Sequence, residues 1–219
     1  MKLVSLLVSA SLLAACASGP TPPAWQADAK AAIDRATTAY LAGETKASDA
    51  EMERVRRALA STGRADLLAR AELMRCAARV ASLVFEPCER FEALRADAPA
   101  SERAYADHLA ARPLARDDIA RLPAAQQAVA GGEVSLASVQ SIEDPQARLI
   151  AVAVLFQAGK ASPPMIDVAT ETASAQGWRR PLLAWLKVRA LRAEKAGDAA
   201  EAQRLQRRIG LVEGPATKP

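Results

Sequence analysis

The stretch Arg64–Val84, RADLLARAELMRCAARVASLV, determines how the rest of this chain can fold. Apolar residues recur along it every three or four positions, which is the period of an α-helix. They fall into two stripes, which are Leu67, Ala71, Met74, Ala78, Ala81 and Phe85 in the first, and Leu73, Ala77, Val80 and Val84 in the second. A helix with two apolar stripes has to be covered on two sides. We therefore expect a central helix from about Arg64 to Val84.

Helical patterns also precede and follow this stretch. Before it we expect a helix over Trp25–Leu41 that stops at Gly43, and a second that opens with a capping box at Ser48–Glu51 and ends near Ala60. After it we expect a short helix that buries Cys88, Phe91 and Leu94, and helices over 99–109, 116–129 with an interruption at Pro123, 144–157 with Asp144 as N-cap, 162–175 with Ser162 as N-cap, 181–196 from Pro181, and 197–212. Gly131-Gly132 is the clearest interior break and divides the chain into two candidate halves, 25–130 and 133–213.

The composition is that of a helical protein. The chain has 219 residues, 53 of them alanine, and aromatic residues make up only 4%. Alanine favours helices and lets them approach closely, whereas sheets are rich in β-branched and aromatic residues. The net charge of +4 and the hydrophobic share of 51% exclude wholesale disorder. We predict one all-α domain over 25–213, built from antiparallel helical hairpins stacked as an α-solenoid-like array or an irregular helical bundle, with a flexible tail at 214–219.

The N-terminus has the features of an export signal. Lys2 supplies a positive charge, and the largely apolar stretch Leu3–Ala15 has thirteen residues. A membrane-spanning helix needs about 20 residues, whereas a signal-peptide core is shorter. The stretch ends in Leu13-Ala14-Ala15-Cys16, which resembles the lipobox of bacterial lipoprotein precursors. The resemblance implies a signal peptide at 1–15, cleavage between Ala15 and Cys16, and a diacylglyceryl group and an acyl chain on Cys16. An ordinary secretory signal is the alternative.

A lipidated Cys16 would attach the protein to a membrane, because two or three acyl chains give a stable anchor. Ala17 and Ser18 follow the cysteine, where an aspartate marks inner-membrane retention among enterobacterial lipoproteins. The resemblance therefore implies the periplasmic face of the outer membrane. Residues 16–24 are rich in proline, and we expect them to form an extended tether.

Residues 182–211 look like one tetratricopeptide helical hairpin. Gly197-Asp198 matches the turn between the two helices, and Ala202 takes the position where the motif needs a small residue for close contact. Two positions depart from the pattern, since Ala190 replaces the usual glycine and Gln206 stands where an aromatic residue is usual. A 34-residue period does not recur elsewhere in the sequence, so the similarity mainly predicts an α-hairpin.

Cys76 and Cys88 are the two cysteines that lipidation leaves free in an oxidising compartment. On one continuous helix their Cα atoms would lie about 18 Å apart, far beyond the roughly 6 Å of a disulfide. A chain reversal near Pro87 and an extended return of about 16 Å would bring Cys88 beside the central helix. We expect a disulfide, with two buried free thiols as the alternative. We expect no cofactor and no metal, because His108 is the only histidine and two thiols lack further ligands.

Catalytic motifs are scarce in this sequence. His108 lies on an ordinary helical segment without a Gly-x-Ser-x-Gly elbow, and we interpret it as a surface or helix-end histidine. Helical outer-membrane lipoproteins include lytic transglycosylases, but no glutamate here precedes a serine as their catalytic glutamate does. Asp117-Asp118 and Glu143-Asp144 are neighbouring carboxylates, which we interpret as caps or solvated charges because adjacent residues point apart on a helix.

Trp178, Arg179, Arg180 and Trp185 form the candidate partner-binding set. Tryptophan and arginine are frequent anchors of protein interfaces. The alternative is that both tryptophans close the end of the helical core. Basic and acidic residues alternate along the chain, so we expect no nucleic-acid partner.

Two functions from different classes remain. The favoured one is a non-catalytic envelope lipoprotein that faces the periplasm and serves as a scaffold or adaptor for an envelope protein, held in a groove between α-hairpins. The alternative is a hydrolase of an envelope polymer such as peptidoglycan, or a glycan-binding accessory protein, that uses carboxylates without a recognisable motif. An enzyme should show converging carboxyl groups of perturbed pKa in a concave site, whereas a scaffold should show a groove lined by Ala, Leu, Arg and Trp.

Overall fold

The computed structural model describes residues 23–131 and 134–214. The predicted signal peptide, the lipidation site Cys16, most of the tether and residues 215–219 of the tail lie outside these residues. Within them the secondary structure is entirely helical, which confirms the all-α prediction. The helices are α1 (Ala24–Ala42), α2 (Thr45–Ala60), α3 (Ala65–Ala81), α4 (Glu89–Glu92), α5 (Ala100–Leu109), α6 (Arg116–Ile119), α7 (Ala124–Ala130), α8 (Leu136–Gln140), α9 (Pro145–Gln157), α10 (Pro163–Ala175), α11 (Arg179–Lys195) and α12 (Ala199–Glu213). None of the described helices is long and apolar enough to cross a membrane.

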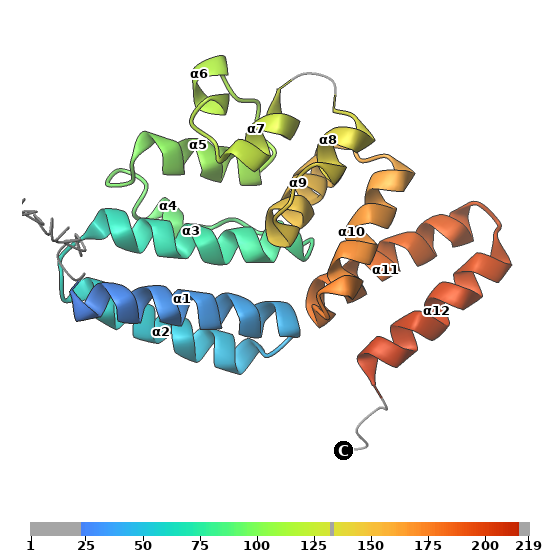
Figure 1. The fold of residues 1–219 in the computed structure, drawn as a ribbon, viewed down its shortest axis with the longest axis horizontal. Helices are drawn as coiled ribbons and strands as arrows, with labels where there is room; N and C mark the ends of the chain where they lie inside the picture. The colour runs from blue at the N-terminus through green and yellow to red at the C-terminus, as the bar shows by residue number, and fades with distance from the viewer. Residues whose placement is uncertain (1–22, 132–133, 215–219) are drawn as a thin grey trace, which may run out of the picture.

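Helix α3 lies at the centre of the arrangement. The α1–α2 hairpin packs along one side of it, the short helices α4 to α7 lie on the other side, and α9 to α12 continue from its C-terminal end (Figure 1). The apolar residues of α3 serve more than one core. Ala71 belongs to a core shared with α1 and α2, and Leu73 and Ala77 belong to the main core. The prediction of a central helix with two covered faces is therefore confirmed.

The main core runs through both candidate halves of the chain. Its buried members extend from Ala69 on α3 to Ile209 on α12. Helix α7 ends at Ala130, as the Gly131-Gly132 break predicts, but the core is not divided there. The three N-terminal helices have a smaller core of their own, with Met52 and Val55 of α2 at its centre.

Two consecutive arginines join the ends of the array. Arg180 at the start of α11 donates from Nε to the carbonyl oxygen of Tyr40 at 2.7 Å and from Nη2 to Thr45 Oγ1 at 2.6 Å. Its guanidinium also lies 4.2 Å from the centre of the Tyr40 ring, within the range of a cation–π contact. Arg179 donates to the carbonyl oxygens of Val212 and Glu213 at the end of α12. Together they attach α11 to the C-terminal ends of α1 and α12.

The predicted capping box at Ser48–Glu51 is wrong. Helix α2 begins three residues earlier, at Thr45, and Ser48 lies inside it. The Ser48 side chain is buried, and its Oγ donates to the carbonyl oxygen of Ala36 on α1 at 2.8 Å. A partner on a neighbouring helix therefore satisfies the hydroxyl that the sequence pattern assigned to a cap.

Other helix starts follow the prediction more closely. Asp144 caps α9 by accepting the N–H of Ala147 at 2.6 Å. Ser162 precedes α10 as expected, although its side chain makes no capping hydrogen bond. Helix α11 begins at Arg179, two residues before the predicted start, and Pro181 occupies its first turn, where a missing N–H removes no helical hydrogen bond.

The last two helices form the predicted α-hairpin. Gly197 makes the turn with φ of 73°, and Asp198 caps α12 by accepting the N–H of Glu201 at 3.0 Å. Ala202 is buried on α12, as are Ala190 and Ala193 on α11. All three alanines belong to the main core.

A buried ion pair joins α2 to α3. Arg56 Nε donates to Glu72 Oε1 at 2.5 Å, and Arg56 Nη2 donates to Glu72 Oε2 at 3.0 Å. The exposed fractions of the two side chains are 13% and 4%. The hydrogen bond to Glu72, opposed in part by burial, raises the pKa of Arg56. A bidentate pair of this kind fixes how α2 and α3 lie along one another.

Replacing Arg56 by methionine should destabilise the protein, because the buried Glu72 carboxylate would lose its counter-charge. We expect a loss of about 3 kcal/mol in the free energy of unfolding, measured with urea. The double variant Arg56→Met/Glu72→Met should recover most of this loss, since it leaves no unpaired charge. If the double variant were as unstable as the single one, packing would matter at this site and the ion pair would not.

Candidate binding groove

The largest exposed apolar side chain of the central helix lies in a groove. Met74 is 40% exposed although its helix is covered on two sides. Two hollows of about 300 and 340 Å³ meet at Met74 and Tyr105, and we call them together the α3 groove. The first is lined by Asp34, Thr37, Thr38, Met74, Ala77, Tyr105, Gln146 and Ile150, and the second by Arg70, Leu73, Met74, Ser101, Glu102, Tyr105, Arg121, Leu122 and Pro123.

Four helices and one connecting segment shape the groove. Helix α3 supplies its apolar floor, α1 one wall, α5 and α9 the other, and the segment before α7 closes one end. Met74 belongs to the first stripe of α3, the stripe that α1 and α2 cover at Ala71. At Met74 neither α1 nor α5 comes close enough to bury the side chain, so an apolar surface stays open to solvent.

Polar groups along the rim are held by ion pairs. Arg70 donates from Nε to Glu102 Oε1 at 2.6 Å, and Ser101 Oγ donates to Glu102 Oε2 at 2.6 Å. Burial alone would raise the pKa of Glu102, but the hydrogen bonds from Ser101 and Arg70 outweigh it and lower the pKa. Glu102 is therefore a fixed anion at neutral pH.

Tyr105 contributes an aromatic ring and a hydroxyl to the groove. Burial raises the pKa of its phenol far above the ordinary value, with a smaller contribution from the charge of Asp144. The hydroxyl thus keeps its proton at physiological pH and can both donate and accept a hydrogen bond. The ring lies roughly parallel to that of His108 one helical turn away, at 6.3 Å between centres.

The carboxyl groups with perturbed pKa do not have the properties of a general acid. Hydrogen bonds from arginines, opposed in part by burial, lower the pKa of Glu51, of Glu201 and of Asp66, the last to about 2. Glu102 is lowered as well. A catalytic acid at neutral pH needs a raised pKa. All four are ion-paired anions: Glu51, Glu102 and Glu201 pair with arginines on neighbouring helices, and Asp66 pairs with Arg64 two residues away.

The candidate set Trp178, Arg179, Arg180 and Trp185 is divided between the core and the surface. Trp185 is fully buried and packs edge-on against Phe156 at 5.7 Å between ring centres. Trp178 is partly buried and packs against both the main core and the small cluster that contains Tyr40 and Ala78. Both arginines donate hydrogen bonds to other residues of the chain. For Trp185 the structure agrees with the alternative, a tryptophan that closes the helical core, because long-range packing buries its ring.

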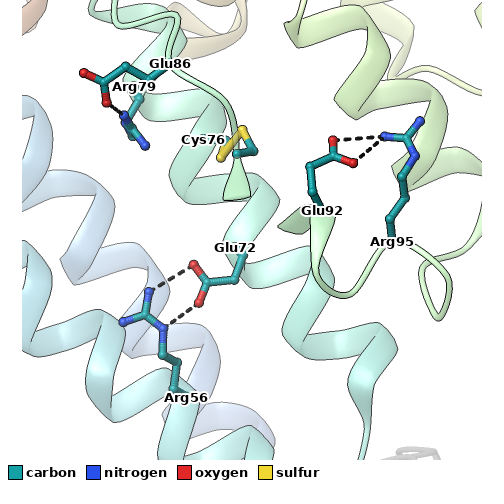
Figure 2. Close-up of a disulfide and its surroundings, with 8 residues drawn as sticks. Arg56, Glu72, Cys76, Arg79, Glu86, Glu92 and Arg95 are labelled. Carbon is teal, nitrogen blue, oxygen red and sulfur yellow. Dashed lines mark hydrogen bonds and ion pairs between the residues drawn. A yellow bond between two sulfur atoms is a disulfide. The ribbon is translucent and has the colours of Figure 1, made fainter. Parts of the chain in front are cut away.

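Cys76 and Cys88 are joined in the structure, as the spacing predicts, with their Cα atoms 6.0 Å apart. The chain leaves α3 after Ala81, reverses through residues 82–87 and returns beside it (Figure 2). In this view the ion pair of Arg79 with Glu86 lies on one side of the disulfide, and that of Glu92 with Arg95 on the other. Among the residues that the structure describes, no cluster of three metal-binding side chains occurs.

His108 lies at the end of α5, as expected, but it is buried and not on the surface. Its Nε2 makes a hydrogen bond of 3.0 Å with Gln126 Oε1, and Gln126 Nε2 donates to the carbonyl oxygen of Ala147. This chain of contacts joins α5, α7 and α9 behind the α3 groove.

Comparison with known proteins gives no match to this chain, either with a protein family, a curated protein or a solved structure.

Sequence reasoning missed the α3 groove. Met74 was one of six residues in an apolar stripe, and nothing in that pattern distinguishes a covered position from an open one. Tyr105 carries the better signal, because it is one of only two tyrosines in an aromatic-poor chain and is followed three residues later by the only histidine.

Stability should fall between pH 7 and pH 5 because of His108. Burial lowers its pKa, and the hydrogen bond with Gln126 offsets this only in part. As the pH falls below about 6.5, the unfolded chain therefore takes up the proton before the folded chain does, and folding loses up to about 1.4 kcal/mol per pH unit. Urea unfolding at several pH values measures this slope.

The variant His108→Gln is the control, since no other side chain in the sequence has an ordinary pKa in this window. Its free energy of unfolding should be nearly flat from pH 7 to pH 5. An unchanged slope in the variant would assign the pH dependence to other groups.

Proposed function

We propose that this chain is a lipid-anchored envelope protein that faces the periplasm and holds a segment of a protein partner in the α3 groove. The anchor part of the proposal rests on the Leu13-Ala14-Ala15-Cys16 sequence and the export signal before it. The binding part rests on Met74, an apolar side chain on the central helix that the fold leaves open between hydrogen-bonding walls.

The surroundings of Met74 suit a polypeptide segment. The apolar floor of Leu73, Met74 and Ala77 can bury an aliphatic or aromatic side chain of the partner. Thr37, Thr38 and Gln146 on the walls can exchange hydrogen bonds with its main chain. Combined apolar and hydrogen-bonding contacts are the usual basis of peptide recognition.

The electrostatics favour a scaffold over a hydrolase. Glu102, the buried carboxylate of the groove, is held as an anion by Arg70 and Ser101. It therefore cannot donate a proton to a glycosidic oxygen at neutral pH, which is the step that such hydrolysis begins with. Its role in this proposal is to hold α5 against α3 so that the groove keeps its shape.

The binding part is tested by photo-crosslinking in intact cells. A photoreactive amino acid at Thr38, an exposed position on the groove wall, should crosslink a discrete partner. The same residue at Gln203, exposed on α12, should not. Adding Met74→Glu should abolish the crosslink from position 38, because it places a charge on the apolar floor.

Leu211→Glu is the matched control for this charge, because Leu211 is also exposed but lies on α12. It should leave the crosslink unchanged. Identical crosslinks from positions 38 and 203, or a crosslink that survives Met74→Glu, would exclude the groove as the binding site.

The lipid anchor is tested independently. Radiolabelled palmitate should be incorporated into the wild-type chain and not into the Cys16→Ser variant, and equal labelling of the two would exclude the anchor.

A further inference from the structure

The two cysteine residues of the disulfide differ in their exposure to solvent. Cys76 lies on α3 within the main core, and only 7% of the residue is exposed. Cys88 lies before α4 at the edge of that core and is only partly buried. A reagent in solution therefore reaches Cys88 more easily than it reaches Cys76.

A hollow opens beside Cys88, the more exposed cysteine. It has a volume of about 290 Å³, and Cys88 forms part of its lining together with Phe85, Pro87, Glu92, Arg112 and Gln157. Cys76 is not part of this lining. The hollow can hold a short segment of a peptide that carries a cysteine, and its wall contains both apolar and charged side chains.

We propose that Cys88 is the sulfur through which this disulfide is made and broken, and that the hollow receives the disulfide or dithiol of the exchange partner, with Cys76 as the internal second cysteine. In formation, the Cys88 thiolate attacks one sulfur of the partner disulfide and expels the other as a thiolate. The Cys76 thiolate then attacks Cys88, closes the Cys76–Cys88 bond and expels the second partner sulfur. Two electrons and two protons pass from the cysteines to the partner, which leaves as two thiols.

The reverse reaction starts at the same sulfur. A partner thiolate attacks Cys88, and the bond to Cys76 breaks with the electron pair on the Cys76 sulfur. Cys76 lies within the main core and does not line the hollow, so a partner in the hollow reaches Cys88 and not Cys76. Formation and reduction therefore both pass through a mixed disulfide at Cys88.

The reduced chain keeps the two cysteines near one another without the covalent bond. Phe91 of α4 is fully buried in the main core, and Ala98 after α4 is buried as well. These apolar contacts hold the segment of Cys88 against α3 before oxidation. Closing the bond then needs only a small movement of the chain, which favours the second step of formation.

The two single-cysteine variants test this assignment. Full-length Cys76→Ser and Cys88→Ser are treated with oxidised glutathione, quenched with acid and digested with trypsin. The peptides Cys76–Arg79 and Val80–Arg90 separate the two sites from each other and from Cys16. Cys88 in the first variant should acquire glutathione at least about tenfold faster than Cys76 in the second.

In urea the two rates should become nearly equal, which shows that the difference belongs to the folded chain. A second measurement uses the wild-type chain, reduced, treated briefly with oxidised glutathione and quenched with acid. The early mixed disulfide should lie on Val80–Arg90. Equal rates in the folded variants, a faster Cys76, or a mixed disulfide on Cys76–Arg79 would overturn the assignment.

Discussion

Helix α3 has to bury apolar side chains on two sides, and the positions of the other helices follow from this constraint. On one side Ala71 lets α1 and α2 approach closely, and the buried pair of Arg56 with Glu72 fixes the register of α2. On the other side Leu73 and Ala77 join the main core with α9. The contacts of Arg180 with Tyr40 and Thr45 then bring α11 back to the first hairpin. A small, alanine-rich chain thus builds its main core and the smaller N-terminal core on one doubly covered helix.

The same constraint produces the surface on which the proposed function depends. Helix α1 lies on one side of α3, and α5 and α9 lie on the other. Between them a strip of α3 stays uncovered, and Met74 lies on this strip. Two contacts hold the walls of the groove in place: Glu102 is tied to Arg70 on α3, and His108 to Gln126 on α7. A pre-formed groove of this kind loses little conformational freedom when it binds a partner. The disulfide joins α3 to the residue before α4, and neither of its cysteines lines the groove.

Local signals in the sequence predicted much of this fold. The stripes of α3, the cap at Asp144, the hairpin at Gly197-Asp198 and the pairing of Cys76 with Cys88 depend on residues close in sequence or on the reach of a short segment. Contacts between distant segments were not predictable in this way. Ser48 lost its capping role to a carbonyl oxygen twelve residues away, Trp185 was drawn into a core built from several helices, and Met74 was left open by the spacing of α1, α5 and α9. In each case three-dimensional packing decided between roles that the local pattern left equal.

Hydrogen exchange resolved by peptide, at increasing urea concentrations, tests most directly whether α3 holds both parts of the chain together. Amides that exchange only through global unfolding share one free energy and one dependence on denaturant. If α3 holds the chain together, the amides of α1, α3, α9 and α11 should lose protection in a single transition, with α3 among the most protected segments. Protection that persists in α9 to α12 after α3 has exchanged fully would contradict it, because those helices would then be folded without the central one.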